Sequence, residues 1–113
     1  MLVAFSIAPS GTSDLSRENP EGSVHDAVAA AVAVVRKSGL PNSTDSMFTT
    51  IEGEWDEVMA VVKHATEAVG RYGSRVSLVL KADIRPGYSE ELTGKVERME
   101  AAIAEQEQYE GHS

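Results

Sequence analysis

Hydrophobic residues alternate with small or polar residues in three stretches of the chain, and this two-residue period predicts β-strands. The three stretches are residues 2–8, 49–54 and 75–83. The apolar side chains that would share one face of a sheet are Val3, Phe5, Ile7, Ile51, Val76, Leu78 and Leu80. Residues 42–48 are polar and contain no Pro or Gly, so they predict an edge strand that forms a hairpin with 49–54.

Three longer segments place apolar residues three or four positions apart, which predicts amphipathic helices. The first helix spans 24–38, the second begins at Trp55 and ends near Gly70, and the third spans 93–107. The predicted stripe of the first helix is Val24, Val28, Ala31, Val32 and Val35. The stripe of the second is Val58, Val61, Val62, Ala65, Val69 and Tyr72, and that of the third is Val96, Met99, Ala102 and Ile103. Residues 9–22 and 84–92 carry Pro and Gly and are predicted loops.

The predicted order of elements is β-α-β-β-α-β followed by an extra helix. This order favours an α+β, ferredoxin-like fold, in which two helices cover one face of a four-stranded antiparallel sheet. We expect one domain over residues 1–113. The other face of the sheet would be exposed to solvent, covered by the third helix, or buried against another subunit. Its predicted residues are Ala4, Ser6, Thr50, Glu52, Ser77, Val79 and Lys81.

The charge balance narrows the classes of partner. The chain has 18 acidic and 10 basic residues and a net charge of −8. Such a surface repels phosphate groups, so nucleic-acid binding and docking on an anionic membrane are disfavoured. It mildly favours a cationic ligand, although solubility alone also explains it. The absence of cysteine excludes disulfides and thiolate metal sites, and it is compatible with a cytoplasmic location. No run reaches the ~20 apolar residues of a membrane span.

No catalytic or metal-binding motif stands out along the chain. The densest polar run is 49–56, which offers hydroxyls, carboxylates and the only tryptophan. These groups suit a flat, cationic heterocycle, because a carboxylate neutralises charge and an aromatic ring stacks. From the residues alone, the favoured explanation is a hairpin that leads into a capped helix, with Trp55 packed at its start.

Four segments resemble the family of small thiamine-binding proteins. The most specific is 49–58 (TTIEGEWDEV), and the others are 6–12 (SIAPSGT), 81–85 (KADIR) and 92–96 (LTGKV). The resemblance implies a ferredoxin-like chain that assembles into a homodimer or homotetramer. It also implies non-enzymatic binding of thiamine or its hydroxymethylpyrimidine moiety, with no cofactor, metal or catalytic residue. The ligand-binding residues that it implies are Ser6, Thr12, Thr49, Thr50, Glu52 and Trp55.

Two other functions stay open at this point. An oligomeric structural or regulatory module would bind a protein partner and ignore thiamine. A small enzyme would need an ionisable group with a perturbed pKa inside a cavity, and Glu52 is the candidate for that role. The fold alone does not decide among these functions.

Overall fold

The computed structural model describes residues 1–18, 23–87 and 89–111. Over this part of the chain the elements follow the predicted alternation, with a short helix added near the start. In order they are β1 (Leu2–Ser10), α1 (Asp14–Glu18), α2 (Ser23–Lys37), β2 (Asn42–Thr44), β3 (Thr49–Glu52), α3 (Trp55–Val69), a 3-10 turn (Gly70–Tyr72), β4 (Arg75–Asp83) and α4 (Glu91–Gly111).

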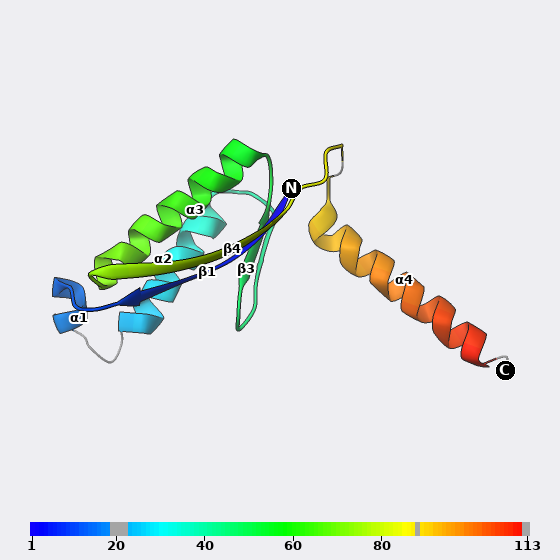
Figure 1. The fold of residues 1–113 in the computed structure, drawn as a ribbon, viewed down its shortest axis with the longest axis horizontal. Coiled ribbons are helices and arrows are strands. Elements are labelled where there is room, and N and C mark those ends of the chain that lie inside the picture. Colours follow the sequence, from blue (N-terminus) through cyan, green and yellow to red (C-terminus); the bar gives the residue numbers. More distant parts are fainter. Residues whose placement is uncertain (19–22, 88, 112–113) are drawn as a thin grey trace.

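The four strands form one antiparallel sheet in the order β2-β3-β1-β4. Helices α2 and α3 pack side by side on one face of this sheet (Figure 1). This arrangement is the predicted α+β, ferredoxin-like fold. Because β1 lies between β3 and β4, it positions residues from both halves of the chain.

The core lies between the sheet and α2 and α3, and it confirms the predicted inward faces of β1, β3 and α3. Its buried members are Val3, Phe5, Ala27, Ala31, Val35, Ile51, Val58, Val61, Val62, Ala65 and Val69. The stripe of α2 is rotated from the prediction, since Val24 and Val28 are exposed and Ala27 is buried. Small alanines at the contact let α2 approach the sheet closely. Leu78 is also exposed, because β4 is an edge strand that the helices cover only in part.

The segment after the first strand is more ordered than the predicted loop at 9–22. Strand β1 continues to Ser10, which pairs with Arg75 of β4. Helix α1 follows, and the hydroxyl of Ser13 donates a hydrogen bond of 2.9 Å to the backbone carbonyl of Arg71. These contacts with the second half of the chain organise the segment. The rest of the predicted loop, 19–22, lies outside the described residues.

A tight turn joins β2 to β3. One carboxylate oxygen of Asp45 accepts hydrogen bonds from the backbone N–H groups of Met47 (2.8 Å) and Phe48 (2.9 Å). These two hydrogen bonds lower the pKa of Asp45, because both favour the ionised carboxylate. The bond from Phe48 has the larger effect and that from Met47 the smaller. Turn geometry therefore limits β2 to Asn42–Thr44, shorter than the predicted strand.

Helix α4 starts two residues earlier and ends four residues later than predicted. Its first turns lie against the end of the sheet, and the rest of the helix extends away from the body (Figure 1). The molecule consequently measures 63 Å along its longest axis but only 31 and 20 Å along the others. The part of the chain that the structure describes contains no helix long and apolar enough to cross a membrane.

Candidate functional site

The face of the sheet opposite α2 and α3, called the open face below, carries three of the predicted ligand residues. Strand register places Thr50 and Lys81 on either side of Ala4, in one row across β3, β1 and β4. Ser6 and Glu52 follow on the same face, because side chains two positions apart along a strand point the same way. The alternation in the sequence predicted this face correctly.

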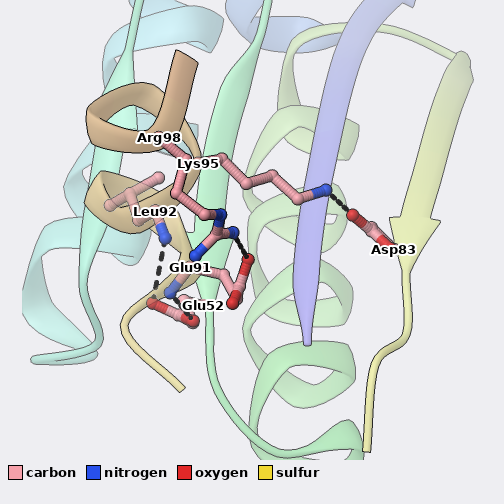
Figure 2. Close-up of polar contacts among 6 residues, drawn as sticks. All are labelled: Glu52, Asp83, Glu91, Leu92, Lys95 and Arg98. Carbon is pink, nitrogen blue, oxygen red and sulfur yellow. Dashed lines mark hydrogen bonds and ion pairs between the residues drawn. The ribbon is translucent and has the colours of Figure 1, made fainter. Parts of the chain in front are cut away.

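Glu52 has a structural partner that the sequence did not reveal. Its side chain is only 6% exposed, and its two oxygens accept hydrogen bonds from the first backbone N–H groups of α4. The distances are 2.6 Å to the nitrogen of Glu91 and 3.3 Å to the nitrogen of Leu92 (Figure 2). The carboxylate therefore caps α4 from another element of the fold. Its negative charge also interacts favourably with the positive, N-terminal end of the helix dipole.

Two ion pairs fasten the same end of α4. Lys95 reaches over the sheet to Asp83 at the end of β4. Arg98 pairs at 2.7 Å with Glu91, which lies about two helical turns before it (Figure 2). Glu91 itself is 5% exposed, so its negative charge needs such a partner. Together with the cap, these contacts hold the first two turns of α4 against β3 and tie them to the end of β4.

A cavity of about 540 Å³ opens at the foot of α4, beside this cap. Its walls are Leu40, Pro41, Glu52, Gly53, Ser89, Glu90, Leu92 and Thr93. We call it the α4-foot cavity. It combines apolar walls with the carboxylates of Glu52 and Glu90, and its size falls within the usual range of ligand pockets, roughly 300–1,000 Å³. Such a lining suits an organic cation. A carboxylate has about four acceptor positions, so Glu52 can cap α4 and still face a ligand.

Glu90, at the rim of the cavity, has an unusual backbone. Its φ of 57° is the only positive value outside glycine among the described residues. This left-handed conformation is uncommon for a residue with a long side chain, and such residues concentrate at functional sites. No pattern in the sequence predicted this conformation.

The remaining predicted ligand residues do not join this cavity. Thr49 faces the helices, is 9% exposed, and its hydroxyl lies 3.1 Å from that of Thr44. Together with Ser6 it lines a cavity of about 160 Å³ between α2 and the β2–β3 turn. Trp55 is 55% exposed and lines a cavity of about 220 Å³ with Pro86. Thr12 is exposed beyond the end of β1. Of the six predicted residues, the α4-foot cavity contains Glu52.

A metal centre does not emerge from the described residues, since they contain no group of three or more His, Cys, Asp or Glu side chains placed to hold an ion. Asp45, whose pKa is lowered by the backbone N–H groups of Phe48 and Met47, lies in an exposed turn outside the α4-foot cavity. The two acids that line the α4-foot cavity, Glu52 and Glu90, suit a ligand that carries positive charge.

Comparison with known proteins shows which family the chain belongs to. A family model described as "Thiamine-binding protein" matches residues 3–100. The chain belongs to this family. A UPF0045 protein from Mycobacterium bovis is 50% identical over 101 residues, which cover 88% of this chain and 91% of the relative.

Two solved structures support the fold. A hypothetical protein from Methanocaldococcus jannascii superposes with a TM-score of 0.71 at 28% identity, covering 87% of this chain and 93% of that protein. A protein from Thermotoga maritima, described as a "putative thiamine biosynthesis/salvage protein", superposes with a TM-score of 0.64 at 22% identity. That comparison covers 81% of this chain and 91% of the other.

Proposed function

We propose that the chain binds thiamine, or its hydroxymethylpyrimidine moiety, without chemically changing it. It would act as a carrier or sensor in the cytoplasm, as a homodimer or homotetramer. The family supports the class of ligand. The α4-foot cavity is the observation that supports a binding site at this position, because two acidic residues and several apolar residues line it.

The chemistry of thiamine matches this lining. Its thiazolium ring is a permanent cation, so a carboxylate beside it needs no proton transfer to form an attractive pair. Its aminopyrimidine ring is flat and offers hydrogen-bond donors and acceptors. The apolar walls at Leu40, Pro41 and Leu92 would shield the rings from water, and Glu52 and Glu90 would neutralise the charge.

A thermal-shift titration tests this function. Thiamine, its pyrimidine alcohol and thiamine phosphate are each added to the full chain. A ligand at ~100 times its dissociation constant stabilises the folded state by ~2.7 kcal/mol, which raises the melting midpoint by several degrees in a domain of this size. A saturable rise supports the proposal. A flat response at millimolar concentration of all three compounds contradicts it.

Glu90 tests the position of the site more sharply than Glu52, because Glu90 lines the cavity while the side-chain cap of α4 comes from Glu52. Glu90→Gln removes one charge and nearly preserves shape, so we expect a several-fold weaker dissociation constant for thiamine. Glu97→Gln is the matched control, since Glu97 is an exposed acid on α4 outside the cavity. Equal effects of the two variants would mean that only net charge matters and would remove the cavity from the proposal.

A further inference from the structure

The outer part of α4 carries an apolar stripe that nothing covers. We call residues 95–109 the α4 arm; every described side chain in this range is exposed. Val96, Met99 and Ile103 lie on one side of the helix and are 52%, 53% and 41% exposed. Spacing of three and four residues puts such side chains in one line. Most helices are stabilised by packing of their apolar face against another surface. An exposed stripe on an isolated helix therefore adds little to the stability of that helix.

The open face of the sheet is a second uncovered surface in the same chain. Along β4 its outward residues Ser77 and Val79 are exposed, and Ala8 opposite Ser77 is exposed on β1. These side chains are small, so a helix can approach the strands closely. Helices α2 and α3 occupy the other face, and α4 reaches the open face only at its first turns (Figures 1 and 2).

The two surfaces have opposite charge. Beyond Arg98 the α4 arm contains acids and no bases. Glu100 and Glu107 follow Val96 and Ile103 by four positions, so these two exposed acids lie beside the stripe. On the open face of β4 the exposed Arg75 and Lys81 flank Val79 at either end. Among the described residues, neither of these cations and neither of these two acids takes part in an ion pair. Electrostatic complementarity of this kind sets the orientation and partner of a contact.

The two surfaces also have similar lengths. A helix rises about 1.5 Å per residue, so the 15-residue arm is about 22 Å long. A strand rises about 3.3 Å per residue, so the six steps from Arg75 to Lys81 span about 20 Å. The arm of one molecule can therefore cover the stretch between the two cations.

We propose that the α4 arm packs on the open face of a second copy of this chain, and that the second copy returns the same contact. A two-fold arrangement covers both surfaces in both molecules at once, because each chain brings one arm and one open face. Pairing of two α4 arms with each other is disfavoured, since the acids of both arms would meet while Lys95 and Arg98 are already engaged. The inference rests on the self-association proposed above and is independent of the ligand.

Cysteine crosslinking tests the contact, because the natural chain contains no cysteine. Chains with Val79→Cys are co-expressed with differently tagged chains that carry one cysteine in the stripe, at position 96, 99 or 103. A short bismaleimide is then added. We expect mixed, covalently linked dimers from the stripe positions. Ala101→Cys, on the opposite side of the arm, is the matched control and should give little product.

The alternatives give distinct products. Dimers of two stripe-cysteine chains, without mixed dimers, would show that arms pair with arms and would overturn the proposal. An oligomer in sedimentation experiments that gives no mixed crosslinks would overturn the arm contact but leave the proposed self-association intact. A monomer at all concentrations would overturn both, while the thiamine titration would still report independently on ligand binding.

A second variant measures how much the contact contributes. Met99→Gln together with Ile103→Gln keeps good helix formers but removes the stripe. We expect the dissociation constant of the oligomer to rise by at least about tenfold, because two half-exposed apolar side chains lose their burial in each arm. Ala101→Gln should leave it unchanged. An unchanged dissociation constant in the double variant contradicts the proposal.

Discussion

The cap on α4 leads to the most specific prediction about a single residue. Glu52→Gln keeps the size of the side chain but replaces one acceptor oxygen with an NH₂ group, which cannot accept a hydrogen bond from the N–H of α4. Loss of a helix cap costs about 1 kcal/mol and up to about 2 kcal/mol in favourable cases. Since Glu52 is 6% exposed and its shorter bond is 2.6 Å, we expect a cost near the upper end.

This cost should appear locally. Among the described residues of a single chain, the hydrophobic core contains none from α4, so in the monomer α4 can open without unfolding the sheet. A cost of about 1–2 kcal/mol raises the population of the open state roughly 5- to 30-fold. Native-state hydrogen exchange should therefore show a matching loss of protection in the amides at 94–98. Protection in β1 should change by less than a factor of about two.

Glu97→Gln is the control for the lost charge, because Glu97 lies on the same helix and takes part in no ion pair among the described residues. It should leave exchange at 94–98 nearly unchanged. The reasoning is refuted if Glu52→Gln leaves protection in α4 intact. It is also refuted if β1 and α4 lose protection equally, since Glu52 would then support the whole fold.

Three further predictions concern the scaffold. Ile51→Ala should lower the free energy of unfolding by about 2–5 kcal/mol in urea denaturation, because Ile51 is fully buried; a change below about 1 kcal/mol would contradict its place in the core. The N–H of Phe48 is the main reason that the pKa of Asp45 is lowered. The ionised carboxylate therefore stabilises the fold above its unfolded pKa of about 3.8, and this stabilisation is lost as pH falls through the lower folded value. Asp45→Asn should remove this acid-dependent step from the stability measured between about pH 5 and 2. Gly73→Ala should lower the melting midpoint, because a Cβ would lie 2.5 Å from the carbonyl oxygen of Ser10, and a neutral effect would show that the β1–β4 end relaxes freely.

The sequence predicted the elements that have a clear hydrophobic periodicity of their own. The alternation in 75–83 predicted the bounds of β4, and the predicted stripe of α3 matched its buried side. The short helix α1 was missed because Ser13 fixes it through the distant Arg71, and no local pattern encodes that contact. The rotation of α2 was missed because its alanines and valines are both apolar, so hydrophobicity alone did not choose the buried ones.

The candidate site was predictable only in part for a similar reason. Alternation correctly placed Thr50 and Glu52 on one face, and the densest polar run did contain a residue of the α4-foot cavity. The contact between Glu52 and Glu91 spans 39 positions in the sequence and joins a strand to a helix end. Such a pairing depends on the path of the loop before α4, which composition and periodicity do not specify.

The most direct test of the central claim is equilibrium dialysis of the full chain against radiolabelled thiamine, because it counts bound ligand without relying on heat or on a melting transition. The account predicts saturable binding that approaches one thiamine per chain, weakens several-fold in Glu90→Gln and keeps its strength in Glu97→Gln. The absence of bound thiamine at millimolar concentration, for folded protein, would contradict it.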